Sequence, residues 1–136
     1  FVPFRHTITT LHTHLLKAGI VNECIHGDVT VRERTDIFKR FQNDDSLRVL
    51  VIQPQAAAHG VTLTAADTIN WYSPVTSAET YLQANARIDR PGQRHPMTVV
   101  HIEGSPVERK LYGMLQNNIA THGRIVDLYK QEMDET

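Results

Sequence analysis

The chain has 136 residues, of which 40% are hydrophobic and 21% are charged, and its formal net charge is −1. This length and apolar content suit one globular domain with a buried core, and they exclude an intrinsically disordered chain. No apolar run approaches the roughly 20 residues that a membrane-spanning helix needs, so we expect no membrane contact. The charge balance offers no global basic field, and any contact with nucleic acid must therefore be local.

Cysteine and histidine usage narrows the chemistry. The single Cys24 excludes an internal disulfide and a cysteine-based zinc site, and it fits the reducing interior of a cell. The eight histidines show no metal-ligand spacing, so no metal site is predicted. The chain opens on an apolar run, residues 1–4, without an initiator methionine. We therefore expect residues 1–136 to be one domain of a longer protein.

The apolar pattern predicts strands that alternate with helices. Strands are expected at residues 1–4, 21–26, 49–52, 68–72 and 97–102. Helices are expected at residues 7–18, 31–42 and 78–89, with a long last helix that starts after Ser105 and breaks near Gly123. Residues 55–66 read as a loop that contains one helical turn. This alternation predicts an open α/β domain whose parallel sheet is covered by helices on both faces.

Residues that begin and end helices support these boundaries. Thr30 and Glu33 match a capping box, and Ser77 and Ser105 are N-cap candidates. Gly19 is a C-cap candidate. The third helix is expected to run to about Asp89, before the break at residues 91–92.

The usual phosphate-binding motifs are missing. The chain contains neither G-x-x-x-x-G-K-[ST] nor G-x-G-x-x-G. Asp134 and Glu135 lie in a polar tail, whereas a Walker B pair follows an apolar strand. The domain is therefore not expected to bind a nucleotide by itself through a phosphate loop.

Two arginines form the strongest chemical signal. Arg87 and Arg90 are three residues apart, so on a helix they share one face, and Gln83 precedes Arg87 by four. Two guanidinium groups presented together suit the oxygens of a phosphate group. The alternative, which spacing alone leaves open, is a solvated helix face with an ion pair to Asp89.

The same residues carry a family resemblance. Gln83, Arg87, Arg90, Gly92 and Gln93 give the pattern Q-x-x-x-R-x-x-R-x-G-Q, which resembles motif VI of the Swi/Snf-like ATPases in helicase superfamily 2. Four further segments resemble that family in the same order: Phe4 with the helix after it (motif IV), residues 27–41, residues 53–67 (motif V) and residues 105–111. The match covers about residues 1–115.

The resemblance implies the second RecA-like lobe of a two-lobed motor, with the three-layer fold of the P-loop NTPase type. It implies that ATP with Mg²⁺ is bound mainly by the first lobe, and that the track is nucleic acid, with double-stranded DNA favoured. It places the protein inside the cell: in the cytoplasm for a bacterium or phage, in the nucleus for a eukaryote. The implied site residues are Arg87 and Arg90 for catalysis, Gly60 and Gln83 with both arginines for ATP, and Gly27, Arg34, Gln55, His59 and Thr62 for nucleic acid.

Some positions depart from the family pattern, and some alternatives stay open. Gln53 and Pro54 replace the usual Ser-Thr of motif V, and two alanines at 57–58 replace Gly-Gly. His59 with Gly60 is similar to phage and bacterial forms. The alternative functions are a superfamily 2 helicase that acts on RNA or single strands, and a non-catalytic docking module.

One basic and two aromatic positions also have structural alternatives. Arg34 is expected to orient its own helix through Glu33 or Asp36, rather than to contact phosphate. Trp71 and Tyr72 are expected to pack in the core or between lobes, with base stacking as the alternative.

Overall fold

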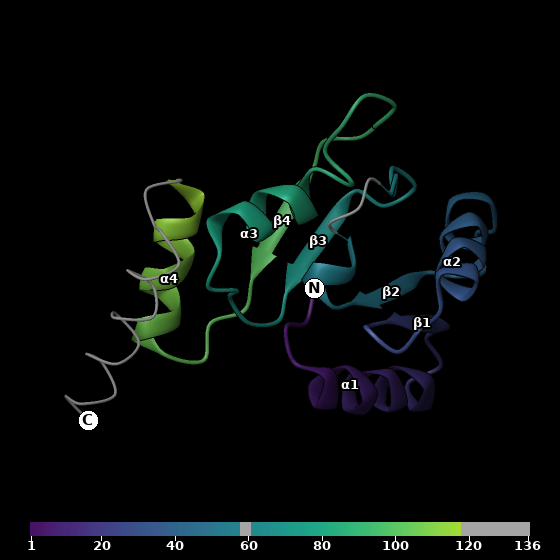
Figure 1. Ribbon diagram of the computed structural model, residues 1–136, viewed down its shortest axis with the longest axis horizontal. Coiled ribbons are helices and arrows are strands. Elements are labelled where there is room, and N and C mark those ends of the chain that lie inside the picture. The colour runs from purple at the N-terminus through teal and green to yellow at the C-terminus, as the bar shows by residue number, and fades with distance from the viewer. Residues whose placement is uncertain (58–60, 118–136) are drawn as a thin grey trace.

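Two pairs of parallel strands form the centre of the molecule (Figure 1). A computed structural model describes residues 1–57 and 61–117. Within it, β1 (Asn22–Ile25) pairs with β2 (Val49–Ile52), and β3 (Thr68–Trp71) pairs with β4 (Thr98–His101). Each strand lies within one residue of its predicted bounds at either end. The predicted parallel α/β architecture is confirmed.

The first residues of the chain make backbone hydrogen bonds to both strand pairs. The Val2 N–H donates to the Ile52 carbonyl of β2 at 2.9 Å. The Tyr72 N–H donates to the Phe1 carbonyl at 3.0 Å, so residues 1–2 also contact the end of β3. The strand predicted at residues 1–4 is therefore present as two residues that lie between β2 and β3, before α1 (Arg5–Lys17) begins.

Helices cover both faces of the β1–β2 pair. Ile8 of α1 packs on Val51 and Val2, so α1 covers the face on which Val51 lies. Alternate residues of a strand point to opposite faces, and Ile52 packs with Ile37 of α2 (Val31–Asn43) on the other side. The resulting helix–sheet–helix order is the predicted three-layer arrangement.

Aromatic side chains fill the core of the β3–β4 half. Trp71 is fully buried, and its indole N–H donates to the side-chain oxygen of Asn85 at 2.9 Å. Tyr81 lies beside Trp71, with ring centroids 5.0 Å apart, and the Tyr112 hydroxyl of α4 (Pro106–Gln116) donates to the Trp71 carbonyl. The predicted core role is thus confirmed for Trp71, whereas Tyr72 is exposed.

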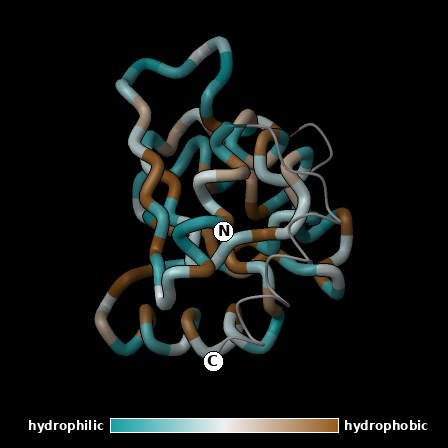
Figure 2. The backbone as a smooth tube through the Cα atoms, turned by 90° about the vertical axis from the view of Figure 1, so that its left-hand side faces the viewer, coloured by the Kyte–Doolittle hydropathy of each residue, from teal (hydrophilic) through white to brown (hydrophobic). Residues whose placement is uncertain are grey.

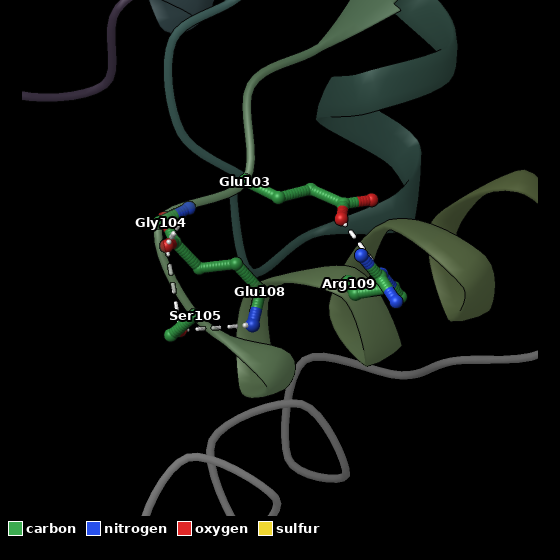
Figure 3. Close-up of polar contacts among 5 residues, drawn as sticks. All are labelled: Glu103, Gly104, Ser105, Glu108 and Arg109. Atoms are coloured by element: carbon green, nitrogen blue, oxygen red, sulfur yellow. Dashed lines mark hydrogen bonds and ion pairs between the residues drawn. The ribbon is translucent and has the colours of Figure 1, made fainter.

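Side-chain caps fix the helix starts where the sequence placed them. The hydroxyls of Thr30, Ser77 and Ser105 each accept a backbone N–H from the residue three positions on. Figure 3 shows the cap of α4, where Glu108 in turn accepts the Gly104 N–H at 2.7 Å. The helix break expected near Gly123 lies outside the described residues.

Hydrophilic loops project from this core. The loop between α3 (Ala78–Asn85) and β4 stands at the top of Figures 1 and 2, where Figure 2 colours it mostly as hydrophilic. Another connection, between β2 and β3, contains the short helix η1 (Pro54–Ala57), which is the helical turn predicted within residues 55–66.

Of the helices in residues 1–57 and 61–117, none is long and apolar enough to cross a membrane.

Candidate functional site

Both arginines lie in turns beyond α3, not on the helix. The expected helix to Asp89 is wrong, because α3 ends at Asn85. After Asn85 the N–H groups of Arg87 and Ile88 bond carbonyls three residues back, those of Ala84 and Asn85, so the chain continues as turns. The Arg87 carbonyl instead accepts the Leu63 N–H at 2.8 Å. Arg87 and Arg90 therefore do not share a helix face; both belong to one compact turn.

That turn is fastened to the segment before β3 by three hydrogen bonds. Besides the bond from Leu63 to Arg87, the Arg90 guanidinium donates to the Val61 carbonyl at 3.3 Å. The Gln93 amide donates to the Ala66 carbonyl at 2.7 Å. Residues 61–66 belong to the motif V-like segment and residues 87–93 to the motif VI-like segment. The structure thus joins two motifs that the sequence separates by about twenty residues.

Gln93 holds the turn from inside, a role that sequence reasoning missed. Its amide nitrogen also donates to the Ile88 carbonyl at 3.2 Å. Its amide oxygen accepts the backbone N–H groups of Arg94 and His95 at 3.0 and 3.2 Å. The only sequence signal was its position after the Pro-Gly break, at the end of the quoted pattern. One side chain thereby links both ends of the turn to the neighbouring segment.

Gln83 lies one turn earlier, on α3. Its amide donates to the Glu79 carboxylate at 3.1 Å, an (i, i+4) contact on the helix surface. The side chain is only partly buried. Gln83 therefore lies on the helix that leads into the arginine turn, and its amide is held by the exposed Glu79.

The turn between β1 and α2 is built by Arg34. Its guanidinium donates to the carbonyls of Val29 and His26, both at 3.0 Å. The expected partners Glu33 and Asp36 are therefore wrong, because the guanidinium bonds two backbone carbonyls of the turn instead. Gly27 sits exposed in the same turn, and a Cβ built there would meet nothing within 4 Å.

Of the other predicted nucleic-acid residues, some lie in the described segments and some lie outside them. Gln55 on η1 and Thr62 are exposed. Gly27 follows β1 and Gln55 follows β2, so both lie at the carboxyl edge of this parallel pair, where open α/β sheets bind ligands. His59 and Gly60 lie outside the described residues. Among the described residues, no three His, Cys, Asp or Glu side chains group as metal ligands would.

Comparison with known proteins assigns the fold to a family. The profile described as "Helicase conserved C-terminal domain" matches residues 1–92. The chain belongs to this family. The Swi/Snf-like resemblance is also confirmed, so the chain is a C-terminal RecA-like lobe of a superfamily 2 helicase.

Individual relatives are similar over most of the chain. A Caenorhabditis elegans homologue of "SWI/SNF-related matrix-associated actin-dependent regulator of chromatin subfamily A-like protein 1" is 26% identical over 126 residues, or 92% of this chain and 18% of the relative. The human "DNA annealing helicase and endonuclease ZRANB3" is 29% identical over 144 aligned positions, which cover 98% of this chain and 13% of the relative. This helicase lobe therefore spans less than a fifth of these relatives.

A solved structure supports the same fold. The C-terminal part of the Fun30 ATPase domain aligns with a TM-score of 0.77 at 19% identity, covering 85% of this chain and 37% of the other. At this identity the likeness concerns the fold, and it agrees with the parallel strands and three layers described above.

Proposed function

We propose that this lobe is the second half of an ATP-driven motor that moves along double-stranded DNA. The nucleotide is held between this lobe and a first RecA-like lobe of the same protein. The supporting observation is the fastening of the arginine turn to residues 61–66. A fixed turn presents charge in one geometry, which a docking module has no need of. The fastening therefore favours the motor over the non-catalytic alternative.

In this proposal, Arg87 and Arg90 contact the γ-phosphate when the two lobes close. Water attacks the γ-phosphorus, the bond to the bridging oxygen of ADP breaks, and negative charge spreads over the transferred group. Guanidinium groups held in place stabilise that charge in the transition state. Gln83 and Gly60 are proposed to line the same closed interface.

Magnesium is assigned to the first lobe. Among the described residues, no three His, Cys, Asp or Glu side chains lie together as ligands for a metal ion. The phosphate loop and the acidic Walker B residues are likewise assigned to the first lobe.

The nucleic-acid track is proposed to follow the carboxyl edge of β1 and β2. Gly27 and Gln55 are exposed there, and Thr62 and His59 belong to the segment that connects this edge to the arginine turn. Arg34 shapes the turn that carries Gly27, through its two bonds to backbone carbonyls. Relatives whose names include DNA annealing and chromatin support DNA as the polymer. A motor of this kind works inside the cell, in the nucleus of a eukaryote or the cytoplasm of a bacterium or phage.

Arg90→Ala in the two-lobed protein tests the proposal. We expect kcat for ATP to fall on the order of 10³-fold, about 4 kcal/mol, with ATP binding nearly unchanged. Arg90→Lys should rescue poorly, because a point charge does not reproduce the forked contact. The lost bond to Val61 should cost about 1 kcal/mol of stability, which melting curves of each variant measure.

Arg94→Ala is the matched control, since Arg94 lies in the same loop and is exposed. It should keep near-normal turnover. Near-normal turnover in Arg90→Ala would remove the catalytic assignment. A collapse of the melting temperature in that variant would instead show that Arg90 serves only to hold the turn.

A further inference from the structure

Residues 61–66 are held by the last turn of α2 as well as by the arginine turn. The amide oxygen of Gln42 accepts the Ala65 N–H at 2.6 Å, and its amide nitrogen donates to the Thr64 hydroxyl at 3.2 Å. Both ends of one amide are therefore bonded to the same short segment, more than twenty residues further along the chain. Gln42 lies just beyond the family-like segment of residues 27–41 and belongs to none of the motif-like segments.

The Gln42 contact joins two elements, whereas the next amide along the helix bonds within α2. Asn43 donates to the Lys39 carbonyl at 2.9 Å, and its side chain is exposed. Gln42 is partly buried, and Phe41 beside it packs against the core cluster that contains Leu63. The end of α2 is thus attached to residues 61–66 by apolar packing and by one amide that bonds at both of its ends.

The segment 61–66 has separate residues for its two neighbours. Three of its residues bond the arginine turn, and two others bond Gln42: the first set is Val61, Leu63 and Ala66, and the second is Thr64 and Ala65. Because no residue is shared, both attachments exist at the same time. A displacement of α2 is therefore passed through this short segment to the arginine turn.

The other end of α2 belongs to the proposed nucleic-acid track. Arg34, near the start of the helix, donates to the carbonyls of Val29 and His26 and so holds the turn that carries Gly27. Arg34 and Gln42 are eight residues apart, which is about 12 Å along an α-helix. Rigid elements of this kind carry energetic coupling between distant sites. One helix thus connects the edge proposed for DNA with the segment that fastens the arginines.

We propose that Gln42 is a positioning residue that couples DNA on the track to the arginine turn, an inference that rests on the proposed function. DNA that displaces the turn around Gly27 displaces α2 with it, and Gln42 carries the shift to residues 64–65. The arginine turn then reaches the geometry in which Arg87 and Arg90 meet the γ-phosphate. Gln42 therefore sets how strongly DNA stimulates hydrolysis, whereas ATP binding does not depend on it.

The test uses the two-lobed protein, with ATP turnover measured in the absence of DNA and with saturating duplex DNA. Gln42→Ala removes both bonds. Gln42→Glu keeps an acceptor for the Ala65 N–H, and its second oxygen accepts the Thr64 hydroxyl. Asn43→Ala is the matched control, because it removes an amide that bonds within α2. The KM for ATP, the affinity for DNA and the melting temperature are measured for each variant, and turnover is measured well below the lowest melting temperature.

Gln42→Ala should lower the stimulation by DNA at least about fivefold, while turnover without DNA, the KM for ATP and the affinity for DNA stay unchanged. Gln42→Glu should recover most of the stimulation, and Asn43→Ala should match the wild type. Full stimulation in Gln42→Ala would overturn the proposal. A parallel loss of basal and stimulated turnover would also overturn it, because that result indicates a general structural role. If DNA does not stimulate even the wild type, the proposed function fails first and this inference fails with it.

Discussion

Gln93 shows how one neutral side chain organises a cationic turn. Its amide nitrogen bonds the carbonyls of Ala66 and Ile88, while its oxygen bonds two N–H groups of the next residues. These four partners are backbone groups, and the amide nitrogen also contacts the sulfur of Met97 at 3.7 Å. Only an amide has both the donors and the acceptor that this position needs.

Gln93→Glu should therefore destabilise the lobe more than its small change in volume suggests. A carboxylate would face two carbonyl oxygens, and we expect the free energy of unfolding to fall by about 1–3 kcal/mol in urea titrations. Gln93→Ala should fall in the same range. Gln83→Ala is the control: its amide contacts an exposed glutamate, so we expect a change within about 0.5 kcal/mol. Equal losses for Gln83 and Gln93 would show that the turn is held by other contacts.

Among the elements, α4 has a start that is fixed from both sides. The Ser105 hydroxyl accepts the Glu108 N–H at 3.3 Å, and the Glu108 carboxylate reaches back to the Gly104 N–H (Figure 3). This reciprocal pair satisfies two N–H groups that a helix start leaves open. Leu111 and Leu115, which follow on the same helix, are fully buried. The cap therefore sets the position of a core helix.

Glu108→Ala should cost about 1 kcal/mol in the free energy of unfolding, because the Gly104 N–H and the helix start both lose a partner. Glu108→Gln keeps an acceptor oxygen and should retain most of the stability. Arg109→Ala is a useful comparison, since Arg109 is exposed and its solvent-screened ion pair with Glu103 should contribute little to stability. Thermal melts of the three variants give the order; a larger loss in Arg109→Ala would invert this account.

The residues at which helices begin were more predictable than the residue at which α3 ends. The starts of α2, α3 and α4 were readable because Thr30, Ser77 and Ser105 act through local hydrogen bonds. The end of α3 was not, because the turns that follow Asn85 are held by contacts with residues 61–66, about twenty residues away in sequence. Pro91 predicts only that no helix continues past it, not that α3 ends at Asn85.

The whole lobe has almost no net charge, and this limits what it does alone. Its formal net charge is −1, and three of the described basic side chains, Arg5, Arg40 and Arg109, are paired with acids. We expect the isolated chain to bind duplex DNA weakly, with affinity that falls steeply as salt rises. It should not turn over ATP, because it has no phosphate loop. Fluorescence anisotropy against salt and a phosphate-release assay measure both, and turnover by the isolated chain would contradict the two-lobed proposal.

At the scale of the molecule, the sequence predicted the layers and the strand set but not how the sheet is joined. Short apolar runs marked the strands, although Thr98, Val99 and Val100 of β4 are exposed. The split between β2 and β3 depends on which strands are spatial neighbours, and local pattern contains no such information. For the candidate site, the motif residues were readable, whereas the bonds from Arg90 and Gln93 to residues 61–66 arise only when distant loops meet.

The buried indole described above has a spectroscopic consequence. Trp71 is the single tryptophan of the chain, it is shielded from water, and its neighbours include Phe1 and Tyr81. Its emission should therefore lie at short wavelength in the folded lobe and shift to the red when the strand that carries it is exposed. Since Phe1 lies against the same ring, fluorescence alone should register any change in the seam between the two halves of the sheet, without a label and in the unmodified protein.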